Sequence, residues 1–218
     1  LEDFALGFSL TEDLIRGPSD LKRVEVIRYS QGIEIQATVS PECEEVIAGR
    51  TRRMTGRTGC GICGSDSITA VLREVHPVPM VGGFTAAALH RGVQALAAGQ
   101  RLNQAAGAVH AAGWATRNGE VTTIREDVGR HNALDKLIGA LARAEVDSSS
   151  GFVVVTSRAS FEMVQKATAL GTPLLAAISG ATGLAIRLAE EAGLTLVGFI
   201  RSDRHTVYTH PSRLEEAG

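Results

Sequence analysis

Two cysteines separated by two residues are the side chains in this sequence best suited to covalent chemistry. Cys60 and Cys63 lie in the segment Thr58-Gly59-Cys60-Gly61-Ile62-Cys63-Gly64. Glycines on both sides of each thiol remove steric cover, so a reaction partner can approach closely. A cationic surrounding favours the thiolate, which is the nucleophilic form. Residues 46–65 contain no acid and supply four arginines, Arg50, Arg52, Arg53 and Arg57.

The spacing of this pair is compatible with three kinds of chemistry. A structural zinc site normally has four ligands, and Cys43 is the one remaining cysteine, so distant histidines would have to complete it. A thioredoxin-type redox pair follows a strand and opens a helix in a βαβ unit, whereas this pair precedes the βαβ region. A persulfide carrier takes a sulfane sulfur onto one exposed thiolate and passes it on. The spacing alone does not choose among them, but the loop context and the anion-binding loops described below favour the persulfide carrier.

The histidine pattern argues against zinc hydrolysis. Zinc deaminases use His-x-Glu followed by Pro-Cys-x-x-Cys. Ala112 stands where the glutamate after His110 would be, Gly59 replaces the proline, and the cysteines precede the histidine. We therefore expect no bound metal, and we interpret His110, in its apolar stretch, as a core residue.

Among the other histidines, His131 is the candidate for function. It lies in the dense polar run Arg130-His131-Asn132. His205 and His210 are compatible with either a structural or a functional role.

The elements that must position these residues change character near residue 77. Before it, residues 24–29 and 32–39 read as two strands around a turn, and a short helix opens at 41–45. Residues 48–65 read as an irregular loop, because they are rich in glycine, arginine and threonine. The prolines of 76–79 disfavour helix and mark a boundary. We predict a smaller α+β domain over residues 1–76 and a second domain over 77–218.

The second part alternates apolar strands with amphipathic helices, which predicts βαβ units and a mostly parallel sheet. In the helix over 132–144 the core side is Ala133, Leu134, Leu137, Ile138 and Leu141. Ser160 is the expected N-cap of the next helix. The predicted helices are 84–98, 132–144, 160–170 and 183–192; the predicted strands are 120–125, 152–156, 174–178, 194–200 and 206–209, with a close-packed apolar stretch at 107–114.

Four loops of this second part should meet at one end of the sheet. Ligands of open α/β sheets sit beyond the carboxyl ends of the strands, and helix N-termini bind anions there. All four loops carry small or polar residues and three carry arginine, so we expect a phosphate-binding rim. The loops are 126–132, 157–160, 179–183 and 201–204.

The amino-acid composition limits the classes of protein to which the chain can belong. The chain has 218 residues, 44% hydrophobic and 21% charged, with a formal net charge of −2, so no global field indicates nucleic acid. Three cysteines exclude a disulfide scaffold and indicate the cytoplasm. No apolar run reaches the length of a membrane span, and no signal peptide is visible. The chain opens at Leu1, so we expect that a preceding stretch is absent.

Three motifs, and a fourth near the C-terminus, closely resemble the formate dehydrogenase accessory sulfurtransferase family (FdhD). The early segments Leu6-Gly7-Phe8 and Thr11-Glu12-Asp13 also look like that family, so the likeness spans nearly the whole chain. The motifs are Thr58–Gly64, Arg125-Glu126-Asp127-Val128-Gly129-Arg130-His131-Asn132-Ala133-Leu134-Asp135-Lys136, Ser157-Arg158-Ala159-Ser160-Phe161-Glu162-Met163-Val164-Gln165-Lys166-Ala167, and Phe199 to Pro211 with Val207-Tyr208-Thr209-His210-Pro211.

The resemblance implies an α/β fold: a cytidine-deaminase-like three-layer α/β/α sheet without the zinc chemistry, beside the smaller N-terminal domain. It implies a sulfurtransferase that receives persulfide sulfur from a cysteine desulfurase. The acceptor would be the bis-molybdopterin guanine dinucleotide molybdenum cofactor, before its insertion into formate dehydrogenase. A homodimer would present two rims to the two guanine nucleotides of that cofactor.

By motif position, Cys60 would carry the persulfide and Cys63 would assist. The cofactor-binding residues would be Phe199, Ile200, Arg201, Ser202, Asp203 and Arg204, joined at the rim by Arg130, His131, Asn132, Ser157 and Arg158. GDP would mimic the cofactor there, and neither nucleic acid nor a membrane is an expected partner. The alternative hypothesis is a non-catalytic chaperone that only holds the same cofactor.

Overall fold

The computed structural model describes residues 1–54, 75–201 and 204–215, and the structural findings below concern these residues. The N-terminal part begins with helix α1 (Glu2–Thr11). Strands β1 (Leu21–Tyr29) and β2 (Gly32–Val39) form an antiparallel hairpin. Helix α2 (Pro41–Met54) follows. The two strands and the turn between them confirm the prediction for residues 24–39.

A six-stranded sheet forms the centre of the rest of the molecule, with strand order β5-β4-β6-β7-β8-β9. Strands β6, β7 and β8 pair in parallel, while β4 pairs antiparallel with β5 and β6, and β9 pairs antiparallel with β8. Strands β5, β6, β7 and β8 therefore all run in one direction. The bounds are β4 (His110–Thr116), β5 (Val121–Asp127), β6 (Gly151–Val155), β7 (Leu174–Ala177), β8 (Thr195–Gly198) and β9 (Thr206–Val207).

The prediction of a mostly parallel sheet is wrong, because most of the described strand pairs are antiparallel. Among the described strands, two of the five pairings of this sheet are parallel. A parallel connection needs a crossover of roughly a dozen residues or more. The turn between β4 and β5 is shorter than that, and so is the segment between β8 and β9. The short connections thus force antiparallel pairing at both edges of the sheet.

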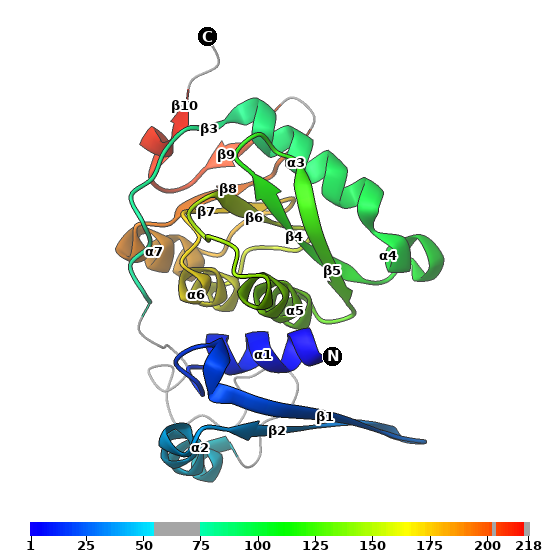
Figure 1. Cartoon of the computed structure of the whole chain (residues 1–218). Coiled ribbons are helices and arrows are strands. Elements are labelled where there is room, and N and C mark those ends of the chain that lie inside the picture. The colour runs from blue at the N-terminus through cyan, green and yellow to red at the C-terminus, as the bar shows by residue number, and fades with distance from the viewer. Residues whose placement is uncertain (55–74, 202–203, 216–218) are drawn as a thin grey trace.

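Helices cover both faces of the sheet (Figure 1). Helices α3 (Ala86–Gly99) and α4 (Arg101–Ala106) lie on one side, α3 along the sheet and α4 beyond its end. Helices α5 (Arg130–Arg143), α6 (Phe161–Leu170) and α7 (Gly183–Ala192) lie on the other. A short parallel pair, β3 (Phe84–Thr85) with β10 (Leu214–Glu215), joins the start of α3 to the C-terminal segment.

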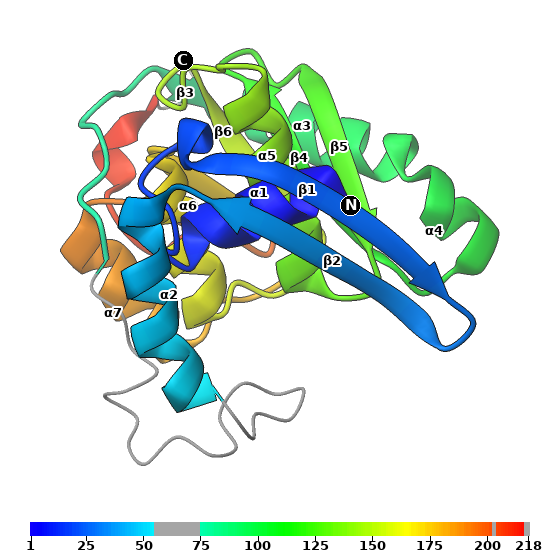
Figure 2. The same ribbon diagram turned by 60° about the horizontal axis from the view of Figure 1, so that its bottom comes forward.

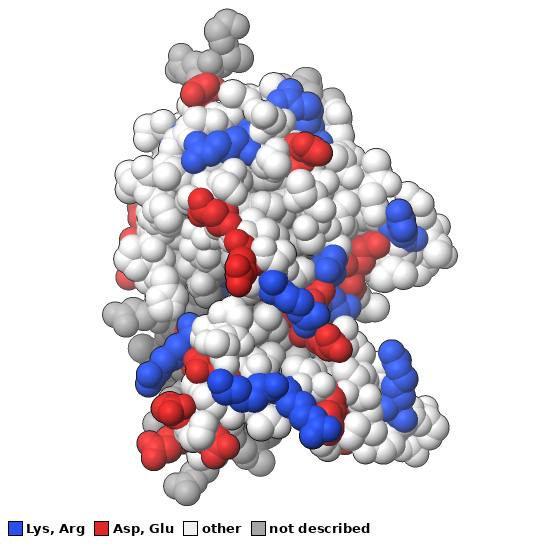
Figure 3. Space-filling view, in the orientation of Figure 1, with Lys and Arg blue, Asp and Glu red and all other residues white. Residues whose placement is uncertain are grey.

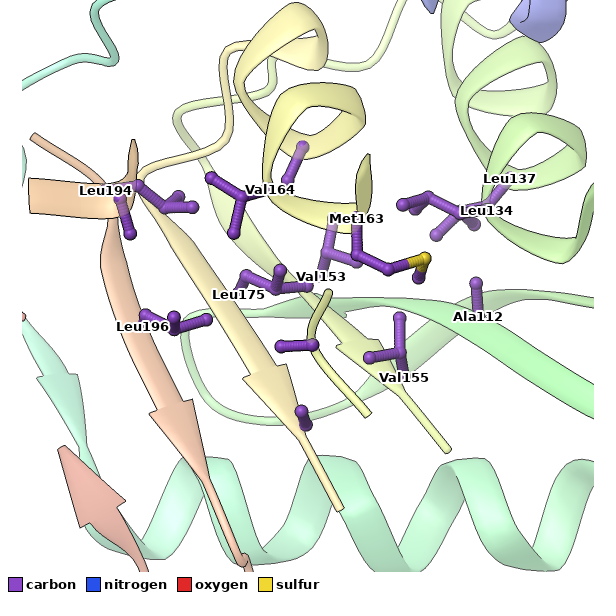
Figure 4. Packing of buried hydrophobic residues seen from close by; sticks show 14 of the residues in the cluster. Ala112, Leu134, Leu137, Val153, Val155, Met163, Val164, Leu175, Leu194 and Leu196 are labelled. Carbon is purple, nitrogen blue, oxygen red and sulfur yellow. The ribbon is translucent and has the colours of Figure 1, made fainter. Parts of the chain in front are cut away.

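The strands send alternate side chains into two separate cores. Val153 and Val155 of β6 face α5, α6 and α7, whereas Phe152 and Val154 face α3. Figure 4 shows Met163 of α6 between Leu134 of α5 and the sheet. Every core position predicted for the helix over 132–144 is buried. This alternation is what a strand period of two imposes on a sheet covered on both faces.

Helix α1 packs against α5 through two glycines. A Cβ on Gly7 would lie 1.8 Å from the Asp135 carbonyl oxygen, and one on Gly139 would lie 1.9 Å from the Asp3 carbonyl oxygen. The two backbones can approach this closely because neither glycine has a side chain. At the periphery of this contact, Arg125 pairs with Asp3 and Arg143 with Glu2, and Figure 3 shows both signs of charge side by side over this seam.

Several element boundaries differ from the predictions. Helix α2 continues to Met54, so residues 48–54 are helical rather than loop; alanine, arginine and methionine favour that state. Helix α3 begins at Ala86 because Phe84 and Thr85 pair as β3 and the Thr85 hydroxyl caps the helix. Ser160 is the N-cap of α6 by position, but its hydroxyl donates to Glu162 instead of capping. Helices α1 and α4 are not predicted at all.

Candidate functional site

The carboxyl ends of β5, β6, β7 and β8 lie along one edge of the sheet, called here the carboxyl edge. Backbone hydrogen bonds tie its loops together: Ala159 N–H donates to the Gly180 carbonyl and Thr182 N–H to the Ala159 carbonyl, at 3.1 Å each. Phe199 N–H donates to the Ser179 carbonyl at 3.2 Å. The expectation that the loops meet is confirmed for the described segments after β6, β7 and β8.

Helices α5 and α6 both begin at this edge, and neither has a side-chain cap. Within the part of the chain that the structure describes, no side chain caps their first N–H groups, which leaves these groups able to bind an anion. Nε2 of His131 lies 2.9 Å from Oε2 of Glu162, and this contact is the main reason that the pKa of Glu162 falls below its ordinary value. Nε of Arg130 is shielded from solvent and has no hydrogen-bond partner among the described residues.

His110, at the start of β4, faces the same cluster. Burial lowers its pKa first, and the charges of Arg130 and His131 lower it further. Burial and these two neighbours, which are themselves candidates for holding an anion, together disfavour the charged form of His110. The interpretation of His110 as an isolated core residue is incomplete, since it is only partly buried and belongs to this cationic cluster.

Asn132 helps to fix the loop rather than to face outward freely. Its side-chain amide donates to Asp127 Oδ1 at 3.2 Å, and the Gly129 N–H donates to the same oxygen at 2.8 Å. Nζ of Lys136 reaches the other carboxylate oxygen at 2.6 Å. Asp127 therefore serves as the fixed point of the turn that leads into α5.

The loop after β6 contributes one buried and one exposed residue. Ser157 is buried, and its hydroxyl donates to the Arg158 carbonyl at 3.0 Å. The Arg158 side chain is exposed. The serine thus stabilises the loop, while the arginine is available to a ligand.

A pocket of about 280 Å³ opens after β8, lined by Phe199, Arg201, Arg204, His205 and Thr206. Phe199 has a φ of +50° and its side chain is half exposed. Its ring fills the space that a Cβ on Gly180 would take, at 2.6 Å.

The residues predicted for this pocket have different environments. Nη1 of Arg201 donates to the carbonyls of Ile178 and Ile200, which fixes the guanidinium at the pocket wall. The Ile200 side chain is buried in the core on the α3 side, so its backbone alone can reach a ligand. Ser202 and Asp203 lie outside the described residues.

The predicted reactive thiols, Cys60 and Cys63, also lie outside the described residues. Cys43 is buried and accepts a hydrogen bond from the Ser40 hydroxyl at 3.4 Å. The end of α2 lies on the same side of the molecule as the loops that precede α5 and α6 (Figure 2). The end of α2 and the carboxyl edge therefore lie on the same side of the molecule.

A larger hollow, of about 490 Å³, lies at the opposite ends of α5 and α6. Leu10, Ile138 and Leu170 form its apolar wall, and His76 and Asp13 pair across its rim at 3.5 Å. It shares no lining residue with the carboxyl edge. Size alone therefore does not identify the site, because the cationic side chains and free helix ends gather elsewhere.

Sequence reasoning missed Glu162 and His90. Glu162 stands in the first turn of α6, a position that favours acids for general reasons, so its contact with His131 has no local signal. His90 is a lone histidine on an alanine-rich helix. Its neighbour His205 comes from residues more than one hundred positions further along the chain. Within the described residues, no three His, Cys, Asp or Glu side chains come together as a metal ion would need.

The protein has a mixed α/β fold, and exposed arginines gather at the carboxyl edge of its sheet. The chain belongs to the FdhD/NarQ family, whose model matches residues 1–215. Among the helices described, none is both long and apolar enough to cross a membrane.

Named relatives match nearly the whole chain. A "Sulfur carrier protein FdhD" of Variovorax paradoxus is 51% identical over 98% of this chain and 77% of its own length. A protein of the same name from Xanthomonas campestris is 54% identical over 99% of this chain and 76% of its own. A crystal structure from Desulfotalea psychrophila, provisionally described as a formate dehydrogenase accessory protein, superposes with a TM-score of 0.73 at 24% identity. It covers 98% of this chain and 79% of that one, and supports the fold.

Proposed function

We propose that this protein is a sulfur carrier required for formate dehydrogenase activity. It accepts persulfide sulfur from a cysteine desulfurase and transfers it to the bis-molybdopterin guanine dinucleotide molybdenum cofactor before the cofactor enters formate dehydrogenase. The observation that carries the proposal is the gathering of exposed arginines and uncapped helix ends at the carboxyl edge, in a family whose named members are sulfur carriers. Cys60 and Cys63 supply the thiols.

Loading is a thiol exchange. The Cys60 thiolate attacks the terminal sulfur of the donor's persulfide. A new S–S bond forms at Cys60, the donor's S–S bond breaks, and the donor cysteine leaves as a thiolate. The number of electrons is unchanged, so the step requires no oxidant.

Delivery as sulfide requires two electrons, and Cys63 supplies them. Its thiolate attacks the inner sulfur at Cys60, a Cys60–Cys63 disulfide forms, and the outer sulfur departs as hydrosulfide toward the molybdenum. A cellular thiol then reduces the disulfide. This division of labour gives each cysteine of the pair a distinct role as carrier and as releasing thiol.

The acceptor is held as a substrate at the carboxyl edge. Arg158, Arg201 and Arg204 provide charge-assisted hydrogen bonds to phosphate, and the free N–H groups at the start of α5 and α6 add to the field. Phe199 offers an exposed ring to the guanine. A homodimer presents two such edges to a cofactor with two guanine nucleotides, and GDP serves as its mimic.

Three further proposals accompany this function. The three-layer arrangement is related to that of cytidine deaminases, without their zinc chemistry. Residues 1–76 act as the smaller unit that carries the CxxC segment, and residues 77–218 as the cofactor-binding unit. The protein works in the cytoplasm, where its thiols stay reduced.

Intact-mass measurement tests the loading step. The protein is incubated with a cysteine desulfurase and cysteine, without reductant, and then weighed. We expect a gain of one sulfur atom that is lost on adding a thiol reductant. Cys60→Ser should show no gain, and the matched control Cys43→Ser, at a buried cysteine, should gain sulfur as the wild type does.

The same experiment separates the alternative function, a chaperone that only holds the cofactor. No mass change on the wild type, neither a gain of sulfur nor the loss of two hydrogens to a Cys60–Cys63 disulfide, with GDP binding intact, would support the chaperone. Active formate dehydrogenase in cells that carry only Cys60→Ser would overturn the sulfur-transfer mechanism.

A further inference from the structure

Two histidines from distant parts of the chain meet beside the pocket that follows β8. Nδ1 of His205 lies 3.3 Å from Nε2 of His90, with ring centroids 5.3 Å apart and an interplanar angle of 67°. His90 belongs to α3, and His205 stands just before β9. Both rings are partly buried. Nitrogens at this distance share one hydrogen, so one ring donates and the other accepts.

Without a ligand, the His205 ring disfavours an extra proton. Burial lowers the pKa of His205 first, and the nearby His90 lowers it further. Among the described residues, the charged groups that line the pocket are Arg201, Arg204 and His205, with no carboxylate among them. Arg91, next to His90 on α3, directs its guanidinium to the Asn118 carbonyl instead.

An anion in this pocket reverses that balance. The phosphate charges favour an imidazolium on His205, which lines the pocket. His205 can carry the added proton because its Nδ1–H then donates to Nε2 of His90, which accepts the hydrogen bond. One proton leaves the solvent, one N–H bond forms on His205, and no other group changes its protonation state.

We propose that His90 and His205 form a proton-linked part of the pocket, which takes up one proton when a guanosine diphosphate ester binds. His90 is a positioning residue that accepts the hydrogen bond from His205. The inference rests on the proposed function in one respect: that this pocket binds the nucleotide end of the cofactor. The further consequence is that the affinity of the pocket for the nucleotide increases as the pH falls.

Calorimetry with GDP-mannose tests the proton uptake. This probe has a pyrophosphate diester, whereas the terminal phosphate of GDP itself titrates at about pH 6 and would obscure the result. Titrations in buffers of different ionisation enthalpy give the number of protons taken up. We expect uptake approaching one proton per site, and an affinity that rises by up to about tenfold per pH unit between about pH 8 and pH 6.

His205→Gln removes the titrating ring and keeps hydrogen-bonding capacity. It should bind with the affinity that the wild type has at high pH, take up no proton and show no pH dependence. His76→Gln, which removes an exposed imidazole at the opposite end of α6, is the matched control and should behave as the wild type. Nuclear magnetic resonance titration of the His205 ring in the wild type should show its pKa rising when GDP-mannose is added, independently of any variant.

The outcomes are distinguishable. Binding without proton uptake, or an unchanged pH dependence in His205→Gln, overturns the histidine proposal and leaves the proposed function intact. A wild type that binds neither GDP nor GDP-mannose overturns the pocket assignment and this inference with it.

Discussion

Two regions of the molecule use charged side chains in opposite ways. Between α1, α5 and α6, Lys166 is 5% exposed and Asp135 is 1% exposed. Nζ of Lys166 lies 2.9 Å from both carboxylate oxygens of Asp135 and 2.9 Å from the Thr11 hydroxyl oxygen. At the carboxyl edge, by contrast, Arg158 and Arg204 are exposed.

Polar residues that stabilise the fold are therefore buried and paired, whereas those available to a ligand are exposed. A buried ion pair must satisfy its own hydrogen bonds, because removing one partner leaves the other charged and unsolvated. Exposed arginines at the edge do little for stability. Both regions contain residues of the sequence motifs, Lys166 in one and Arg158 in the other, so a motif by itself does not distinguish these roles.

The largest expected effect comes from breaking the buried pair. Lys166→Met keeps the length of the side chain and removes its charge, so Asp135 loses its cation. We expect the free energy of unfolding to fall by about 3–5 kcal/mol, measured by urea denaturation. Arg143→Ala removes an exposed ion pair with Glu2 at the edge of the same seam and should cost about 1 kcal/mol or less. Equal losses in the two variants would contradict the comparison.

An intermediate effect is expected at the carboxyl edge, on binding rather than folding. Arg204→Ala removes a charge-assisted hydrogen bond to phosphate, which should weaken GDP binding by about 1.5–3 kcal/mol in calorimetry. The urea midpoint should not move. Arg23→Ala, on the exposed hairpin where Arg23 pairs with Glu25, is the control and should bind GDP as the wild type does. Unchanged affinity in Arg204→Ala would place the anion site elsewhere.

The smallest effect is a pH dependence at the start of α6. The contact with His131 holds the pKa of Glu162 below its ordinary value of 4.5. The pair therefore adds stability above that pH, and the stability is lost as the pH falls through the lowered pKa of the folded state. Glu162 is partly exposed, so we expect about 1 kcal/mol or less. Below pH 4.5, the free energy of unfolding of Glu162→Gln should fall less steeply with decreasing pH than that of the wild type. Parallel plots of this free energy against pH for the two proteins would argue against the pair.

Much of the fold follows from local patterns. The hairpin over 24–39, the core side of α5 and the strands β6 to β8 are predicted because their apolar periodicity is strong. The sheet pairing is not, since strand direction depends on which neighbours a strand finds. Helix α1 is not predicted for a related reason. Gly7 allows a close helix–helix contact, but this role is visible only once the backbone of α5 is in place.

The site divides in the same way. The sequence predicts that loops after parallel strands lie at one edge of the sheet, and it therefore selects the following candidates: Arg130, His131, Arg158, Arg201 and Arg204. Glu162, His90 and His205 acquire their significance from partners far along the chain, with His90 and His205 separated by 115 positions. No local pattern contains such a pairing.

The family likeness, the spacing of Cys60 and Cys63 and the loops that carry arginine are all visible in the sequence. These depend on residue identity and on short-range spacing, which the chain states directly. By contrast, the pairing of Lys166 with Asp135 inside the fold, and the hydrogen shared by two distant histidines beside the pocket, become visible in the folded structure. Burial and charge act through space, so a cationic side chain is buried and paired at Lys166 but exposed at Arg158 and Arg204.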